Sequence, residues 1–261
     1  MARIYPLFSS SKGNCSFIGT EKGGILIDCG VSFKRLSGVL DTNNIPLSAV
    51  QGVFITHEHS DHVAGLKMLT KKTGVPVYGM KRTLQRLCDT DKIAPGTPVI
   101  DMNGNTISCG GSEVSAFPIP HDAIQPCGYR IHTSDDRWCA VCTDLGYVTP
   151  EVDDALRGCR LVLLEANYDE GMLRHGPYPL YLKERILSQN GHLSNIASGA
   201  QAAKLVAQGT THILLGHLSQ DNNRPDIAYN AVRDALSGFV QGKDYLLGVS
   251  PVESQGGTVI F

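Results

Sequence analysis

Several apolar segments of strand length end in a histidine or an aspartate, and this arrangement constrains the fold more than any other feature. The segment GVFIT (52–56) runs directly into HEHSDH (57–62), which holds three histidines and an aspartate within six residues. AFPIP ends at His121, CAVCT at Asp144 and THILLG at His217. Loops at strand ends are where α/β enzymes place their chemistry. We therefore predict sheets whose ends carry a functional site.

The order of apolar runs and periodic segments predicts an α/β protein. Strands are expected at 2–8, 15–20, 23–30, 49–57, 75–80, 160–166 and 211–219, with a further group within 97–148. Helices are expected at 32–44, 60–74, 81–90, 150–158, 179–189, 194–208 and 224–240. Two strand-rich halves with helices outside them favour a four-layer αββα sandwich. Because no linker or fixed-period repeat is visible, we expect a single domain over 1–261.

The composition fits a globular chain with a reduced interior. Hydrophobic residues make up 42% of the chain and charged residues 18%, which allows a sizeable core. No run of 18 apolar residues is present, and the N-terminus lacks the apolar stretch of a secretory signal. The eight scattered cysteines predict reduced thiols and a cytoplasmic protein. Cys139 and Cys142 form a lone CxxC in a strand, where they face opposite sides, so a redox or zinc role is not favoured.

The net charge of −2 argues against nucleic-acid binding through overall basicity. Any such contact must come from the site itself or from a local patch. Three groups are candidates: Lys67, Lys71 and Lys72; Lys81, Arg82 and Arg86; and Arg174, Lys183 and Arg185. The alternative for each group is a solvated helix face.

The His and Asp residues at the strand ends are chemically suited to bind metal. They are His57, His59, Asp61, His62, His121, Asp144 and His217. Imidazole suits zinc, manganese, iron or nickel, and a carboxylate can bridge two ions. Seven ligands are too many for one tetrahedral ion but suit two ions about 3.5–4 Å apart. We therefore predict two divalent metal ions, most readily zinc or manganese, and leave the identity open.

The segment THEHSDH (56–62) resembles the HxHxDH signature of the metallo-β-lactamase fold superfamily. The later His121, Asp144 and His217 match its remaining ligand positions in order, so the resemblance covers nearly the whole chain. It implies that His57, His59 and His121 hold one metal. It implies that Asp61, His62 and His217 hold the second, with Asp144 as the bridge.

The same resemblance implies roles for two aspartates. A hydroxide between the ions would be the nucleophile, and Asp61 would orient it. Asp28, which ends the segment GILI, would support a ligand histidine. The alternative for Asp28 is an ordinary turn aspartate.

Further motifs choose among the reactions of this superfamily. QNGHLSNIASGA (189–200) places His192 before a predicted helix N-terminus, which attracts phosphate. It resembles the histidine-containing loop of ribonuclease Z-type phosphodiesterases, where the histidine would protonate a leaving oxygen. The predicted phosphate contacts are Ser11, Asn14, Ser194, Asn195 and Ser219. The alternatives are a plain helix cap and, for SSSKGNCS (9–16), an ordinary Gly-Ser turn.

Six motifs in order resemble those of the YycJ/WalJ family of bacterial proteins: SSSKGN, HDAIQPCGY, LLEANYDEGML, GPYPLYLKERI, GHLSN and GHLSQDNN. That family is associated with 5′-to-3′ DNA exonuclease activity. The resemblance implies a dinuclear phosphodiesterase that acts on DNA ends. The chain departs from it at Tyr168, where relatives tend to carry His, and at SSSKGN, where they carry a shorter GSSGN. These departures affect substrate contacts near 12 and 168 and leave the seven predicted ligands intact.

Two other functions stay open at the level of sequence. A hydrolase of small esters, thioesters or lactones would use the same ligands, although the GHLSN motif does not support it. A regulatory metal-binding protein without catalysis would usually have lost ligands, and this chain has kept all seven.

Overall fold

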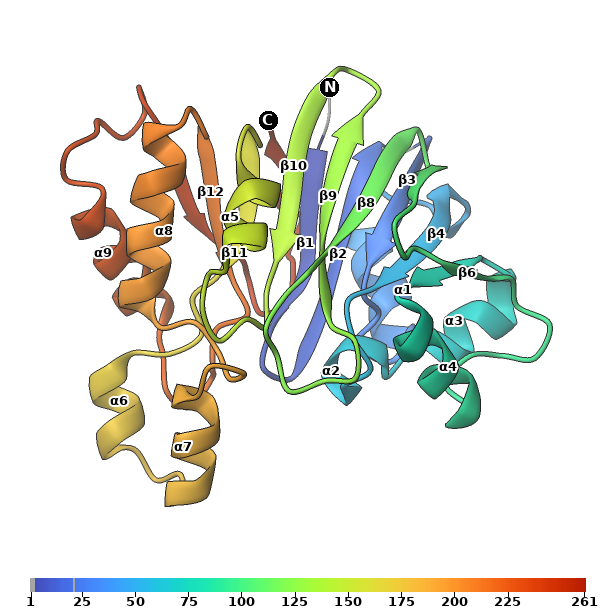
Figure 1. Ribbon diagram of the computed structural model, residues 1–261. Helices are drawn as coiled ribbons and strands as arrows, with labels where there is room; N and C mark the ends of the chain where they lie inside the picture. The colour runs from blue at the N-terminus through green and yellow to red at the C-terminus, as the bar shows by residue number, and fades with distance from the viewer. Residues whose placement is uncertain (1–2, 21) are drawn as a thin grey trace. The chain divides into compact units, whose positions relative to one another are not determined.

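A computed structural model of the chain describes residues 3–20 and 22–261. It contains two seven-stranded sheets, with strand orders β14-β1-β2-β3-β4-β5-β6 and β13-β12-β11-β10-β9-β8-β7, and helices accompany them (Figure 1). The predicted α/β class is therefore confirmed. Ala2, the first residue of the strand predicted at 2–8, lies outside the described residues.

The elements follow the predicted apolar runs closely. The strands are β1 (Arg3–Ser10), β2 (Gly13–Thr20), β3 (Gly23–Ile27), β4 (Val50–Ile55), β5 (Val77–Gly79), β6 (Val99–Asp101), β7 (Thr106–Cys109), β8 (Ser112–Pro118), β9 (Cys127–Thr133), β10 (Arg137–Cys142), β11 (Leu161–Glu165), β12 (His212–Gly216), β13 (Leu246–Val249) and β14 (Val259–Ile260). The helices are α1 (Phe33–Thr42), η1 (Leu47–Ala49), α2 (Ser60–Val63), α3 (Leu66–Thr73), α4 (Lys81–Asp89), α5 (Pro150–Leu156), α6 (Glu170–His175), α7 (Leu180–Leu187), α8 (Asn195–Ala207) and α9 (Pro225–Ala235).

The chain divides into two compact units. Unit 1 comprises Met1–Ala116, Ala123–Arg137 and Pro251–Phe261. Unit 2 comprises Phe117–Asp122 and Trp138–Ser250. That 1–261 acts as one domain stays a prediction.

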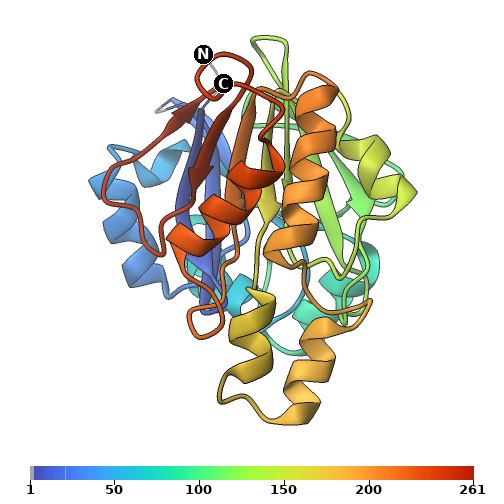
Figure 2. The same cartoon turned by 90° about the vertical axis from the view of Figure 1, so that its left-hand side faces the viewer.

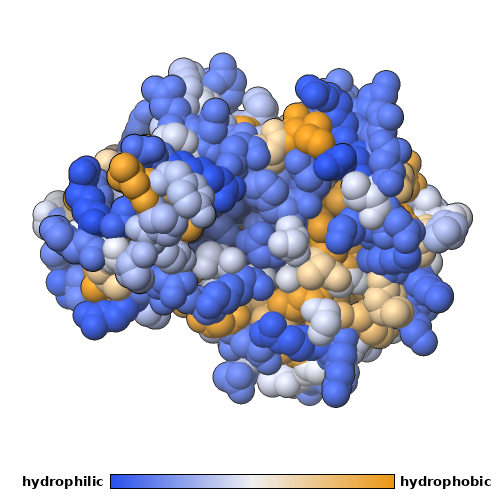
Figure 3. Space-filling view, turned by 90° about the horizontal axis from the view of Figure 1, so that it is seen from below, coloured by the Kyte–Doolittle hydropathy of each residue, from blue (hydrophilic) through white to orange (hydrophobic). Residues whose placement is uncertain are grey.

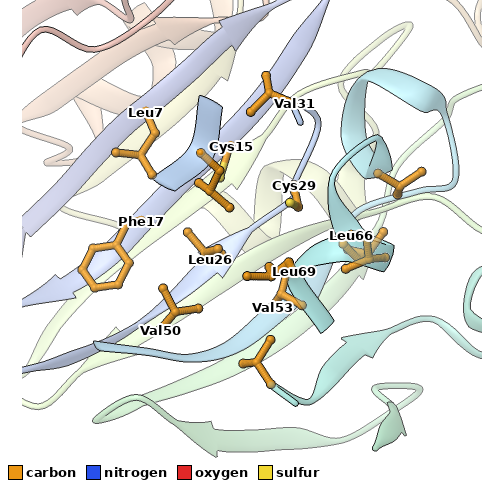
Figure 4. Packing of buried hydrophobic residues seen from close by; sticks show 14 of the residues in the cluster. Leu7, Cys15, Phe17, Leu26, Cys29, Val31, Val50, Val53, Leu66 and Leu69 are labelled. Atoms are coloured by element: carbon orange, nitrogen blue, oxygen red, sulfur yellow. The ribbon is translucent and has the colours of Figure 1, made fainter. Parts of the chain in front are cut away.

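In unit 1, one sheet changes from antiparallel to parallel pairing at β3. Strands β1, β2 and β3 pair antiparallel, whereas β3, β4, β5 and β6 pair parallel. Leu26 and Val53 of this sheet belong to a buried cluster that includes Leu66 and Leu69 of α3 (Figure 4). The i, i+3 spacing puts both leucines on one helix face, and each buried leucine contributes about 1.5–3 kcal/mol. The parallel pairing brings the carboxyl ends of β3, β4 and β5 to one edge.

In unit 2, four strands pair in parallel, in the order β10, β11, β12, β13. Helices α8 and α9 lie over these strands (Figure 2). The core combines side chains of β11 and β12, such as Val162 and Leu215, with Ala202 and Leu205 of α8 and Val232 of α9. The loops that follow the carboxyl ends of β10, β11 and β12 therefore meet at one edge.

The helix predicted over 60–74, with Ser60 as N-cap and Gly74 as stop, is interrupted at its middle. His59 is the N-cap instead, α2 ends at Val63, and α3 begins at Leu66. The cause is Gly65, whose backbone N–H donates to Cys29 O at 2.9 Å. A Cβ at this position would lie 2.1 Å from Val31 O, so only glycine allows this approach. Gly74 ends α3 with a left-handed φ of 68°, as predicted.

Helix α6 was not predicted. Asp169 caps it, because its side chain accepts a hydrogen bond from Met172 N at 2.8 Å. Leu173 of α6 and Ile186 of α7 form a small buried cluster with Tyr168. The two helices lie together at one end of the view in Figure 2. With only 6 residues, α6 gives too short a periodic pattern to be recognised in the sequence.

One face of the molecule is mostly polar. Hydrophilic residues cover most of the face seen from below, and hydrophobic residues form separate patches on it (Figure 3). Within residues 3–20 and 22–261, no helix combines the length and hydropathy needed to cross a membrane. All eight cysteines are free thiols.

Candidate metal centre

In unit 1, the histidine-rich segment follows the carboxyl end of β4, beside the end of β3. Ile27 of β3 pairs with Phe54 of β4, so Asp28 lies next to the residues that leave β4. The Asp28 carboxylate accepts hydrogen bonds from Thr56 N and Thr56 Oγ1, both at 2.8 Å. It also lies 2.7 Å from His62 Nδ1. The structure therefore places Asp28 against a predicted ligand histidine.

This network assigns the tautomers of two buried histidines. His57 and His62 are both 0% exposed. His62 Nδ1 donates to Asp28, and His57 Nδ1 lies 3.0 Å from Thr56 Oγ1, which can accept a hydrogen bond from it. Each ring then keeps Nε2 as the nitrogen that can bind metal. Burial raises the pKa of Asp28, while His62 and the hydrogen bonds from Thr56 act in the opposite direction.

The other predicted ligands of unit 1 lie close to these two rings. The ring centroids of His57 and His59 are 4.5 Å apart, and those of His57 and His62 are 4.1 Å apart. Asp61 Oδ2 lies 3.4 Å from His62 Nε2. Asn14, predicted to contact phosphate, is 7% exposed, and its Nδ2 lies 3.1 Å from His62 Nε2 and 3.3 Å from Asp61 Oδ2. Its amide therefore faces the predicted ligands themselves.

A close approach of two backbone segments sets this geometry. A Cβ on Gly30 would lie 1.7 Å from Asp61 O, so the turn after β3 can pack against α2 only with glycine there. Cys29 N donates to His62 O at 2.8 Å across the same contact. Asp28 has a φ of 63°, in the left-handed region. Such a conformation costs of order 1–3 kcal/mol and is concentrated at functional sites.

In unit 2, four side chains bring possible ligand atoms within 4.8 Å of one another: Asp144, Glu165, His192 and His217. Asp144 follows β10, Glu165 ends β11 and His217 follows β12, so the parallel pairing explains their proximity. Asp144 Oδ1 lies 3.4 Å from His217 Nε2 and 3.8 Å from His192 Nδ1. Asp144 and His217 have positive φ values of 60° and 55°, like Asp28 in unit 1.

Glu165 connects this cluster, although it was not among the site residues predicted from the sequence. It is 0% exposed, and its Oε1 lies 2.8 Å from both His192 Nδ1 and His217 Nδ1. Its Oε2 accepts from Leu145 N and Leu193 N, both at 3.0 Å. Burial alone would raise the pKa of Glu165, but the charges and hydrogen bonds of His192 and His217 outweigh it and hold the pKa well below its usual range. The sequence signal that could have identified Glu165 is its position at the end of the apolar run LVLL, like the predicted ligands at other strand ends.

His121 completes the predicted ligands of unit 2. It is 6% exposed, and its Nδ1 lies 3.1 Å from Gly191 O, which can only accept. Nε2 is then the unprotonated nitrogen, and it lies 3.9 Å from Asp144 Oδ1. Burial lowers the pKa of His121. A lowered pKa favours the neutral ring that a metal ligand requires.

Four of the five predicted ligand histidines thus share one feature: an acceptor holds Nδ1 and leaves Nε2 to bind. The acceptors are Thr56 for His57, Asp28 for His62, Gly191 O for His121 and Glu165 for His217. Protein metal sites orient their histidines in this way. The buried donor sets therefore fit divalent metal ions.

Three of the other four predicted phosphate contacts, Ser194, Asn195 and Ser219, have partners within the protein. Ser194 caps α8, because its Oγ accepts from Ala197 N at 3.2 Å. Asn195 exchanges two side-chain hydrogen bonds with Asn223, at 3.0 and 2.8 Å. Ser219 Oγ accepts from Asn222 N at 3.1 Å. Ser11 lies in the turn between β1 and β2. Contact of these residues with phosphate stays a prediction.

Comparison with known proteins gives consistent results. Residues 24–217 match the sequence model described as Beta-lactamase superfamily domain. The exodeoxyribonuclease YycJ of Bacillus anthracis is 35% identical over 242 residues, which cover 92% of this chain and 91% of that protein. The exodeoxyribonuclease WalJ of Streptococcus pneumoniae serotype 2 is 34% identical and covers 88% of this chain and 87% of its own.

Solved structures support the fold. The metallo-β-lactamase fold protein YhfI of Bacillus subtilis superimposes with a TM-score of 0.72 over 97% of this chain and 98% of its own, at 16% identity. Identity at this level speaks for the fold alone. The fold class predicted from the sequence is confirmed.

Proposed function

The chain belongs to the β-lactamase superfamily and is related to the YycJ and WalJ exodeoxyribonucleases, and on this premise we propose that it is a metal-dependent phosphodiesterase that removes nucleotides from the 5′ ends of DNA. The observation that carries the metal dependence is the shared orientation of the four histidines His57, His62, His121 and His217. The DNA substrate is inferred from the two relatives, each of which aligns over most of both chains.

The seven His and Asp residues at the strand ends are assigned as ligands of two divalent ions. Zinc or manganese is preferred over iron or nickel. Bound ions of this kind supply an activated water and neutralise the charge of the phosphate. Asp61, which is partly exposed beside His62, would accept a hydrogen bond from the attacking water and orient it.

His192 is proposed to protonate the leaving oxygen. Its Nδ1 is held by Glu165 at 2.8 Å, and its side chain is 15% exposed. The carboxylate at Nδ1 fixes the orientation of the ring and leaves Nε2 as the nitrogen that can face the leaving oxygen. Ser194 and Asn195 begin α8 directly after this loop, so the amino end of the helix favours the negative charge of a phosphate nearby.

The His192→Ala variant tests this role. We expect turnover of a phosphodiester to fall about 10²-fold, in the range found for general acids. The metal content should remain that of the wild type, because His192 is not among the assigned ligands. His175→Ala, which changes an exposed histidine of α6, is the matched control. Unchanged turnover in the His192 variant would leave this residue as part of an ordinary helix cap.

The proposed function is tested with DNA duplexes labelled at the 5′ or the 3′ end. We expect the metal-loaded wild type to release nucleotides from 5′ ends, and a His57→Ala variant to lose this activity together with bound metal. Two metals per chain with intact DNA would contradict the substrate. Turnover of thioesters without turnover of bis-p-nitrophenyl phosphate would favour the small-ester hydrolase instead.

A further inference from the structure

The positive charge of the chain is concentrated in one segment of unit 1. Residues 60–98 contain seven Lys and Arg and three Asp, a net charge of +4. The rest of the chain contains 16 Lys and Arg and 22 Asp and Glu, a net charge of −6. The segment forms α2, α3, β5 and α4, and its basic residues lie on or directly after the helices α3 and α4 (Figure 1). Lys67 of α3 pairs with Asp91, two residues after the end of α4, so the two helices approach each other there.

Most of these basic side chains are not neutralised within the protein. All seven are exposed, and Lys67 forms an ion pair with Asp91. Among the described residues, the other six have no acidic side chain within ion-pair distance: Lys71, Lys72, Lys81, Arg82, Arg86 and Lys92. We name these six residues the α3–α4 basic face. An exposed group of unpaired like charges repels itself unless a polyanion or counterions compensate it.

The third basic group considered from the sequence differs in this respect. Arg185 of α7 pairs with Asp122, and Arg174 of α6 lies 3.9 Å from Glu170. Lys183 Nζ donates to Arg174 O at 2.9 Å and to Gly176 O at 2.8 Å, so it satisfies the carbonyls that end α6. The structure therefore separates a group with partners inside the protein, on α6 and α7, from a group without acidic partners on α3 and α4.

The α3–α4 basic face begins at the edge of the sheet that carries the histidines of unit 1. Ile55 of β4 pairs with Gly79 of β5, so Lys81 and Arg82 leave the sheet beside Thr56 and His57. Arg82 N donates to Gln125 Oε1 at 2.9 Å, which fixes the start of α4. Lys71 and Lys72 lie at the far end of α3. Helices of 8 and 9 residues span about 12–14 Å, the length of several successive phosphates.

We propose that the α3–α4 basic face binds the sugar-phosphate backbone of duplex DNA, away from the nucleotide that is being removed. This inference rests on the proposed function and names the surface that holds the substrate. Binding to phosphates releases counterions, so it is independent of sequence and weakens steeply with salt. A local face of this kind explains how a chain with a net charge of −2 holds a polyanion.

The test measures duplex binding as a function of salt, with the metal-loaded protein and a duplex protected by phosphorothioate linkages. The face variants are Lys71→Gln with Lys72→Gln, and Lys81→Gln with Arg82→Gln. The control variant, Arg160→Gln with Lys243→Gln, removes two exposed and equally unpaired charges from unit 2, where they precede β11 and β13. We expect the slope of log K against log salt to shrink by about 1.8 in each face variant, because each phosphate that is no longer neutralised reduces it by about 0.9. The control should keep the wild-type slope.

Slopes that are equal in all variants would overturn the inference. So would tighter binding of the face to poly-L-glutamate, or to phosphatidylserine vesicles, than to the duplex, because the partner would then be an acidic protein or a membrane. The readout does not depend on turnover. Face-dependent binding without DNA cleavage would contradict the proposed function alone, whereas cleavage with face-independent binding would contradict this inference alone.

Discussion

Replacing Asp144 with asparagine is expected to slow the proposed release of nucleotides from DNA by at least about 10³-fold, which corresponds to ~4 kcal/mol of transition-state stabilisation. Asp144 is 2% exposed, and its Oδ1 lies 3.4 Å from Nε2 of the predicted ligand His217. An amide keeps the shape of the carboxylate but loses its charge, so it cannot bridge or neutralise two cations. Single-turnover assays on 5′-labelled duplex and metal analysis of the purified protein measure both effects.

The fold should survive this substitution. The φ of Asp144 is 60°, and asparagine is among the few residues that adopt this left-handed conformation readily. Asp153→Asn is the matched control, because Asp153 is also a buried aspartate of unit 2 but pairs with Lys204 on α8 at 2.8 Å. We expect the control to keep wild-type turnover and metal content. An Asp144→Asn variant with full metal loading and wild-type rates would show that Asp144 is not a metal ligand and is not needed for turnover.

The strands were predicted well from the sequence because their signal is local. The runs LVLLE and HILLG became β11 and β12, and both lie in the parallel part of a mixed sheet, where continuous apolar runs are typical. The break between α2 and α3 could not be predicted, because periodicity continues through Gly65 and the break depends on contacts with Cys29 and Val31, more than thirty residues earlier in the chain. Tertiary contacts of this kind leave no mark in a short sequence window.

In the candidate site, too, local sequence signals were predictive and tertiary contacts were not. Polar residues at the ends of apolar runs identified Asp28, Asp144 and His217. The left-handed backbone of these three residues had no sequence signal, since no glycine marks it. Phosphate contact by Asn14 stays a prediction, but the position of its amide, 3.1 Å from His62 Nε2, was not predicted, because it depends on how the β1–β2 hairpin reaches this sheet edge. Pairing between strands that are distant in the sequence decides such contacts.

Glu165 is the residue whose importance only the structure reveals, and replacing it with glutamine should have the largest effect outside the assigned ligands. The carboxylate accepts four hydrogen bonds, two from His192 and His217 and two from the backbone N–H groups of Leu145 and Leu193. A glutamine has only one acceptor oxygen, so its amide must face two of these donors. We expect metal affinity to fall about 10–100-fold, as for other residues that orient ligand histidines.

The same variant should destabilise the metal-free protein by about 3 kcal/mol, because it leaves buried polar groups without their partner. The effect depends on pH. The pKa of Glu165 is depressed in the folded state, so its stabilising contribution is complete above the unfolded value of about 4.3 and is lost as the pH falls below it. Urea unfolding with a chelator should therefore show the full difference in unfolding free energy between wild type and Glu165→Gln at pH 7, and a shrinking difference below pH of about 4.

The matched control is Glu184→Gln, an exposed change on α7, which is expected to keep the unfolding free energy of the wild type at every pH. A difference that persists undiminished in acid would mean that Glu165 acts through its packing and not through its charge.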